Sequence, residues 1–114
     1  MDRHTPQPFI PVARLSDLDD RGRAVVNVEG TPVAIVRVEG ELYAVQQTCP
    51  HQGGPLSEGD VEGFLLHCPV HAWPFDVRTG RCPVFRGARI RTYAVRVVGE
   101  EIQVAPFSAS VSTS

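Results

Sequence analysis

The chain has 114 residues, of which 42% are hydrophobic and 21% charged, and its formal net charge is −2. These values fit one ordinary globular domain. The sequence has no basic block with interleaved aromatic residues, so nucleic acid is not an expected partner, and it has no apolar run long enough to span a bilayer.

The chain begins with a segment, residues 1–11, that has charge and proline but no apolar stretch. It does not look like a secretory signal, so we expect a cytoplasmic protein. The next segment, residues 16–19, predicts a single helical turn with Ser16 as its N-cap. Runs of β-branched residues then predict short strands at residues 24–28, 33–38, 42–45, 64–66, 91–98 and 102–104.

Glycine-containing pairs such as Glu29-Gly30 and Glu39-Gly40 separate these runs, as is typical of hairpins. We therefore expect residues 1–114 to form one antiparallel all-β domain. The stretch from 49 to 83 is rich in glycine and proline, and a long irregular stretch in a small domain usually serves a function. The expected organisation is a strand base at about residues 9–47 and 84–105, an inserted loop subdomain at about 48–83, and a flexible tail at 108–114.

Two short motifs in this insertion each offer one sulfur ligand and one imidazole. Cys49 and His51 are separated by one residue, Cys68 and His71 by two, and a proline follows each cysteine. An odd total of three cysteines in a cytoplasmic chain favours metal binding over disulfides. Cys₂His₂ ligation suits a tetrahedral zinc ion or a [2Fe–2S] cluster held by sulfur on one iron and nitrogen on the other. Because each loop supplies one ligand of each kind and no helix is evident, the pattern favours the cluster.

The same pattern resembles that of Rieske proteins, Cys-x-His followed after sixteen residues by Cys-x-x-His. Residues 49–56, Cys-Pro-His-Gln-Gly-Gly-Pro-Leu, look like the first cluster loop of bacterial Rieske ferredoxins. Residues 73–76 and 79–80 look like the segment after their second histidine, and the similarity covers about residues 10–105. The resemblance implies a small antiparallel β-sandwich base with a cluster-binding subdomain at one tip. The implied ligands of the [2Fe–2S] cluster are Cys49, His51, Cys68 and His71.

The resemblance also implies redox properties. Two thiolates and two neutral imidazoles leave the oxidised cluster near zero charge, so its potential lies above the value of about −400 mV for plant-type ferredoxins. High-potential Rieske proteins carry two further cysteines that link the loops, and hydroxyl groups near the sulfurs. The matching positions here are Gly54 and Val70 for the cysteines, and Trp73 and Phe75 for the hydroxyls. We therefore expect a potential of about −150 mV, at the low end of the Rieske range.

The other chemically reactive residues have simpler interpretations. His67 adjoins a proposed ligand and is interpreted as a strand residue, because neighbours on a strand point to opposite faces. Cys82 is interpreted as a buried, unreactive small residue and Trp73 as a packing residue. The acidic residues at positions 58, 60 and 62 suit an acidic docking surface or a solvated loop equally well. The five arginines at positions 78–91 are spaced apart and are interpreted as a solvated face.

A single cluster-bearing domain leaves no room for a substrate pocket with a second cofactor, and the sequence has no glycine-rich nucleotide fingerprint. We therefore expect a monomeric one-electron carrier and not an enzyme. The family resemblance implies a flavin-dependent ferredoxin reductase as donor and a terminal oxygenase as acceptor. Two alternatives stay open: a small accessory subunit of a nitrite-reductase-like complex, and a structural zinc-binding module.

Overall fold

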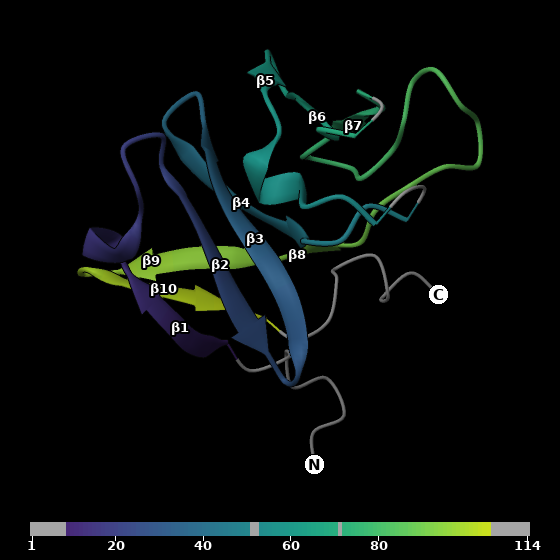
Figure 1. The fold of residues 1–114 in the computed structure, drawn as a ribbon. Coiled ribbons are helices and arrows are strands. Elements are labelled where there is room, and N and C mark those ends of the chain that lie inside the picture. Colours follow the sequence, from purple (N-terminus) through teal and green to yellow (C-terminus); the bar gives the residue numbers. More distant parts are fainter. Residues whose placement is uncertain (1–8, 51–52, 71, 106–114) are drawn as a thin grey trace.

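Short antiparallel strands make up nearly all the regular structure of residues 9–50, 53–70 and 72–105, the part of the chain that the computed structural model describes (Figure 1). The strands are β1 (Ile10–Arg14), β2 (Arg23–Val28), β3 (Thr31–Val38), β4 (Glu41–Gln46), β5 (Val61–Glu62), β6 (Leu65–His67), β7 (Pro74–Asp76), β8 (Thr92–Tyr93), β9 (Val95–Val98) and β10 (Glu101–Val104). Two 3₁₀ turns, η1 (Leu15–Asp17) and η2 (Leu56–Glu58), complete the list. The predicted antiparallel all-β fold is confirmed.

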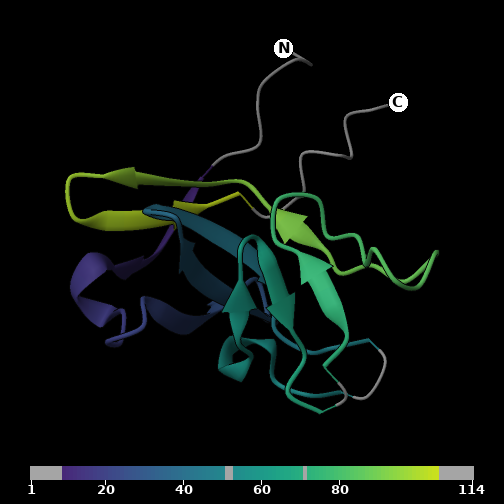
Figure 2. The same ribbon diagram turned by 90° about the horizontal axis from the view of Figure 1, so that it is seen from above.

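The strands form three sheets, ordered β1-β10-β9, β2-β3-β4-β8 and β5-β6-β7. Figure 1 shows β5 to β7 above the β2-β3-β4-β8 sheet, whose strands β2 and β3 cross β9 and β10 in this view. Figure 2 looks down on the β5-β6-β7 sheet, whose strands lie side by side. No helix in the described part of the chain has the length and apolar character needed to cross a membrane.

Strand β3 separates two hydrophobic cores. Val33 and Ile35 are buried with residues of β10 and β8, whereas Ala34, Val36 and Val38 are buried with residues of η2, β6 and β7. Successive side chains of a strand point to opposite faces, so an uninterrupted apolar run such as this one requires cover on both sides. The central sheet therefore has one face toward the β1-β10-β9 sheet. Its other face is toward η2 and the β5-β6-β7 sheet, called the ligand-bearing part of the chain from here on.

Several details differ from the sequence predictions. The helical turn begins at Leu15, and its N-cap is Arg14 and not Ser16, because Asp17 Oδ2 accepts a hydrogen bond from the Arg14 N–H at 2.9 Å. The strand predicted at 91–98 is two strands in different sheets: β8 pairs with β4, β9 pairs with β10, and the chain crosses between the sheets at Ala94. Strands β1, β5 and β7 were not predicted. The tail at 108–114 lies outside the described residues.

Candidate metal centre

The two predicted cysteine ligands lie at the ends of strands from different sheets. Cys49 follows β4 and Cys68 follows β6, and their exposed fractions are 1% and 2%. Both belong to the core on the ligand-bearing side of β3, and neither is in a disulfide. The other two predicted ligands, His51 and His71, lie outside the described residues. Within 9–50, 53–70 and 72–105, no group of three or more histidine, cysteine or acidic side chains is arranged to hold a metal ion.

The first ligand loop is closed by its own backbone. The N–H of Cys49 donates to the carbonyl of Gly54 at 2.9 Å, and the N–H of Gly53 donates to the carbonyl of Cys49 at 2.8 Å. Gly53 has a φ of +74°, in the left-handed region that suits glycine. These two hydrogen bonds thus close the loop between Cys49 and Gly54.

The second ligand loop repeats this pattern. The N–H of Cys68 donates to the carbonyl of Trp73 at 2.9 Å, and the N–H of Ala72 donates to the carbonyl of Cys68 at 2.7 Å. Ala72 takes the place of Gly53 and also has a positive φ, +59°. A non-glycine residue in this region carries strain of about 1 kcal/mol or more. The two loops therefore have the same backbone frame around their cysteines.

The two loops meet at Gly54. A Cβ built on Gly54 would lie 2.6 Å from Val70 Cγ2 and 3.1 Å from Cys68 Sγ. A side chain at position 54 would therefore fill the space beside a thiol of the other loop. Two buried thiols, carried by loops that touch through a glycine, are a donor set that fits a thiolate-bound metal centre.

A buried arginine fixes the segment that follows the first loop. Arg23, on β2, is 7% exposed, and its Nη1 donates to the carbonyls of Ser57 and Gly59, each at 2.8 Å. Burial lowers the pKa of this guanidinium, although an arginine still stays charged. A Cβ on Gly59 would lie 1.9 Å from the carbonyl oxygen of His67, so the turn packs directly against β6. Sequence analysis missed Arg23, because nothing local distinguishes it from exposed arginines such as Arg21.

The neighbours of the second loop lie largely where the sequence predicted. His67 is on β6, as predicted, with its Nδ1 3.3 Å from the Ala72 carbonyl oxygen. Trp73 packs against the core and stacks on Phe85 with ring centroids 4.0 Å apart. Cys82 is buried, as predicted, and its Sγ accepts a hydrogen bond from the Phe85 N–H at 3.4 Å.

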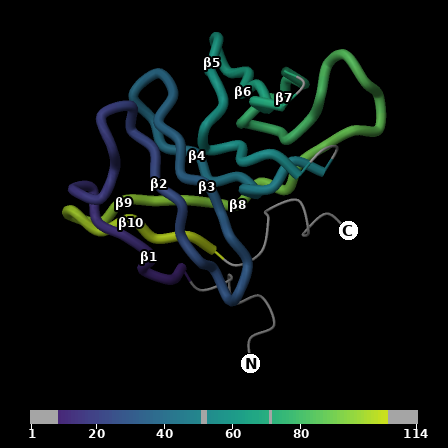
Figure 3. The backbone as a smooth tube through the Cα atoms, viewed as in Figure 1, coloured from purple at the N-terminus to yellow at the C-terminus, as the bar shows by residue number. Residues whose placement is uncertain are grey.

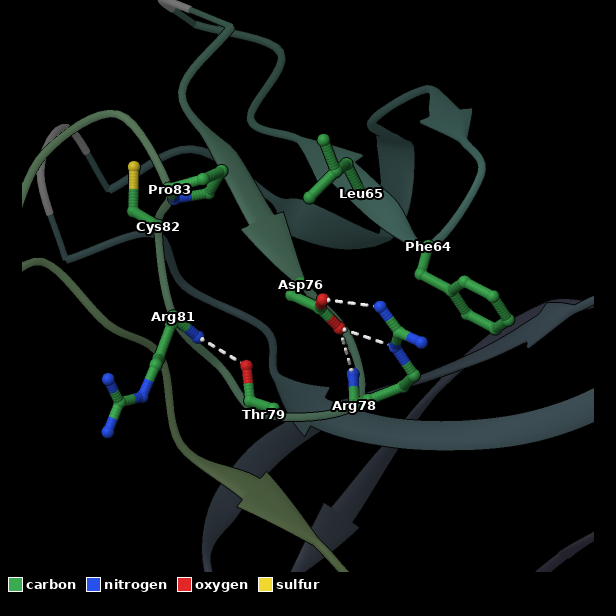
Figure 4. Close-up of a pocket in the computed structure, with 8 residues that line it drawn as sticks. All are labelled: Phe64, Leu65, Asp76, Arg78, Thr79, Arg81, Cys82 and Pro83. Atoms are coloured by element: carbon green, nitrogen blue, oxygen red, sulfur yellow. Dashed lines mark hydrogen bonds and ion pairs between the residues drawn. The ribbon is translucent and has the colours of Figure 1, made fainter.

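A pocket of about 550 Å³ lies between β6, β7 and the segment that follows them (Figure 4). On its wall, the guanidinium of Arg78 forms two hydrogen bonds with the carboxylate of Asp76, at 3.0 and 2.9 Å. These bonds hold the pKa of Asp76 below its ordinary value, and the same pairing raises the pKa of Arg78. Arg78 also lies 4.0 Å from the ring centroid of Phe64. Asp76 and Arg78 therefore neutralise each other, and Arg81 is the remaining charged side chain among the lining residues.

Comparison with known proteins connects this geometry to one family. The family model described as the Rieske [2Fe-2S] domain matches residues 8–104. The chain is 35% identical over 101 residues to the ferredoxin component of a naphthalene 1,2-dioxygenase system from Pseudomonas aeruginosa, an alignment that covers 86% of this chain and 95% of the relative.

Two solved structures show the same similarity. The ferredoxin of carbazole 1,9a-dioxygenase from Nocardioides aromaticivorans IC177 superposes with a TM-score of 0.74 at 33% identity, covering 86% of this chain and 97% of that chain. A chain in the complex of reduced oxygenase and oxidized ferredoxin in carbazole 1,9a-dioxygenase gives a TM-score of 0.73 at 31% identity, with 90% of this chain and 97% of that chain covered.

Proposed function

This chain belongs to the Rieske [2Fe–2S] domain family, and on that premise we propose that it carries single electrons from a flavin-dependent ferredoxin reductase to a terminal oxygenase. It is an electron carrier with a [2Fe–2S] cluster and not itself a catalyst. The observation that carries the proposal is the pair of buried, disulfide-free cysteines, held by two loops of like backbone frame. Matched relatives named as ferredoxin components, one of them in a complex with its oxygenase, support the choice of partners.

We propose that Cys49 and Cys68 bind one iron as thiolates and that His51 and His71 bind the other as neutral imidazoles. The cluster supplies reversible one-electron chemistry. The chain's part is to keep the two thiols in the core, close both loops by backbone hydrogen bonds, and leave room between them at Gly54. With both cysteines buried, electrons enter and leave on the histidine side. Neither Gly54 nor Val70 is a cysteine, which supports a potential of about −150 mV.

The wider organisation is part of the same proposal. We assign residues 48–83 to a cluster-binding subdomain carried on a base of residues 9–47 and 84–105, followed by a flexible tail at 108–114, in a monomeric, cytoplasmic protein. The two faces of β3, each covered by a different core, support this division. Sedimentation equilibrium tests the monomer, and fractionation of the source cells tests the location.

Metal analysis of the purified protein tests the cofactor. We expect two irons and two labile sulfides per chain, and an EPR signal of the reduced protein that shows mixed nitrogen and sulfur ligation. One zinc ion in a colourless protein would establish the structural zinc module instead. Stable co-purification with a large reductase subunit would favour the accessory-subunit alternative.

Substitution tests the ligands. Cys68→Ala and His71→Ala are expected to abolish stable cluster binding, because each removes one of the four proposed donors. Cys82→Ala is the matched control, since Cys82 is also buried but belongs to neither loop. It should keep its full iron content. A His71→Ala protein with two irons and two sulfides would remove His71 from the ligand set.

A further inference from the structure

Charge is very unevenly distributed along the chain. Residues 77–99 contain six arginines and no acidic residue, whereas the rest has five arginines against all thirteen acidic residues. Arg81, Arg86, Arg89 and Arg91 are exposed, and none of them forms an ion pair with a carboxylate of the described residues. A protein with a net charge of −2 thus carries one basic segment, residues 78–91, in which four of the five arginines are uncompensated by any described carboxylate.

The basic segment has a defined shape. Residues 78–91, called the arm from here on, leave β7 and return toward β8, and Figure 3 shows this green segment projecting past the β5-β6-β7 sheet. Arg81 and Arg89 face each other in an antiparallel bridge, and the Cys82 N–H donates to the Ala88 carbonyl at 3.2 Å. The Ile90 N–H closes the base by donating to the Gly80 carbonyl at 2.8 Å.

The end of the arm is apolar and touches the second ligand loop. Val84 is 63% exposed and Phe85 is 41% exposed. The ring of Phe85 stacks on Trp73 at 4.0 Å, and the carbonyl of Trp73 closes the loop of Cys68. Val70, in the same loop, is 45% exposed. The arm therefore places exposed apolar groups, with arginines around them, directly beside a loop that we propose to hold the cluster.

The acidic residues at positions 58, 60 and 62 carry less uncompensated charge than the arm. Glu58 pairs with Arg21 at 3.4 Å, and Glu62 lies 3.7 Å from His67 Nε2. Within the described part of the chain, at positions 58–62 only Glu58 is paired with an arginine, and in the arm only Arg78 is paired, with Asp76, so four arginines of the arm stay uncompensated. Long-range attraction of a partner depends on uncompensated charge, so the arm is the stronger steering element.

We infer that the arm, with Trp73 and Val70, is the docking surface for a redox partner that presents carboxylates around an apolar centre. The inference rests on the proposed function and replaces the interpretation of these arginines as a solvated face. Arginine and aromatic side chains dominate the energy of protein interfaces, and here both kinds lie at one place. Contact through Phe85 and Trp73 brings the partner to within one loop of the proposed iron ligands.

Electron transfer to two haem proteins of opposite surface charge tests the inference. Holoprotein reduced with dithionite, freed of excess reductant, is mixed in a stopped-flow instrument with oxidised cytochrome b5, which is acidic, or with cytochrome c, which is basic. We expect the rate constant for cytochrome b5 to fall about tenfold or more as ionic strength rises from about 0.01 M to about 0.15 M, and the rate constant for cytochrome c not to fall.

Charge-removing variants localise the effect. The double variant Arg86→Gln with Arg89→Gln should slow transfer to cytochrome b5 at low salt by about tenfold. The matched control, Arg14→Gln with Arg96→Gln, removes the same charge from β1 and β9 of the β1-β10-β9 sheet and should behave like the wild type. Reduction potentials measured on each variant show that the driving force is unchanged.

The outcomes separate the two proposals. A rate constant for cytochrome b5 that does not fall as salt is added, or equal slowing by the arm and control variants, would overturn the docking surface while leaving an electron carrier in place. A purified protein with no reducible cluster would instead overturn the proposed function, and it would do so before any acceptor is added.

Discussion

Positions 54 and 70 are close enough to be joined by a disulfide that this chain lacks. A Cβ on Gly54 would lie 3.5 Å from Val70 Cβ, within the range of natural disulfides. The backbone of Gly54 does not have a positive φ, so a cysteine there is not strained. We therefore predict that the double variant Gly54→Cys with Val70→Cys forms a cross-link between the two ligand loops.

The expected gain follows from the loop that the disulfide closes. Closing a loop of about 16 residues with a disulfide raises the free energy of unfolding by about 3 kcal/mol, because the cross-link restricts the unfolded chain. The new Cβ at Gly54 lies 3.1 Å from Cys68 Sγ, and tight packing of this kind costs about 1 kcal/mol. Replacing Val70 removes its Cγ2, which is the closer obstacle at 2.6 Å. A net gain of about 2 kcal/mol should raise the melting midpoint by roughly 8 °C.

Heat-induced loss of visible absorbance, which reports release of the cluster, measures the gain with and without dithiothreitol. Mass spectrometry checks that two hydrogens are lost. The size-matched control is Gly54→Ser with Val70→Ser, which should gain nothing, and Gly54→Ala alone should lose about 1–3 kcal/mol because Val70 Cγ2 obstructs its methyl group. A double cysteine variant that melts like the serine control while fully oxidised would refute the reasoning.

Three further predictions concern the surroundings of the loops. Ala72→Val should lower stability by about 1–2 kcal/mol, because a β-branched residue tolerates a positive φ poorly, whereas Ala72→Gly should be neutral or stabilising; chemical denaturation of the two variants compares them. Arg23→Leu should lower the free energy of unfolding by about 2–4 kcal/mol and speed cluster loss, because it leaves two carbonyls near the first loop without their donor. Equal cluster lifetimes in the variant and the wild type would contradict this. Asp76→Asn should lower the stability of the protein at neutral pH and lower it less in acid. The pKa of Asp76 is lowered in the folded state, so the ionised carboxylate stabilises the fold above the ordinary pKa of 3.8. This stabilisation is lost as pH falls through the pKa of the folded state. Unfolding curves at several pH values should show the difference between wild type and Asp76→Asn shrinking toward low pH.

The strand pattern and the ligand motifs were readable because each is a local signal. The runs at β2, β3 and β4 are long enough for β-branched residues to be recognised, and the spacing of Cys49 and Cys68 from their neighbouring histidines needs no knowledge of the fold. Strand β5 has two residues and β7 begins with a proline, so neither shows a periodic pattern. These strands form because they pair with β6 and are covered by the hydrophobic core. Such tertiary contacts are not visible in the local sequence.

Long-range partners could not be predicted for the same reason. Arg23 finds its carbonyl acceptors 34 and 36 residues away, and the stack of Trp73 on Phe85 depends on how the arm folds back. The arginines at positions 78–91 are spaced like a solvated face in sequence, and only the structure shows that Arg81 and Arg89 face each other in a segment that also carries the exposed Val84 and Phe85. The placement of His51 and His71 stays a prediction.

Because each ligand loop is closed by two main-chain hydrogen bonds, part of its shape is set without the metal. An apoprotein should therefore meet the assembly machinery with both cysteines already in position, and loading becomes a late, local event on a folded chain. A carrier that loses its inorganic centre to oxidants could then be refilled in place, without resynthesis.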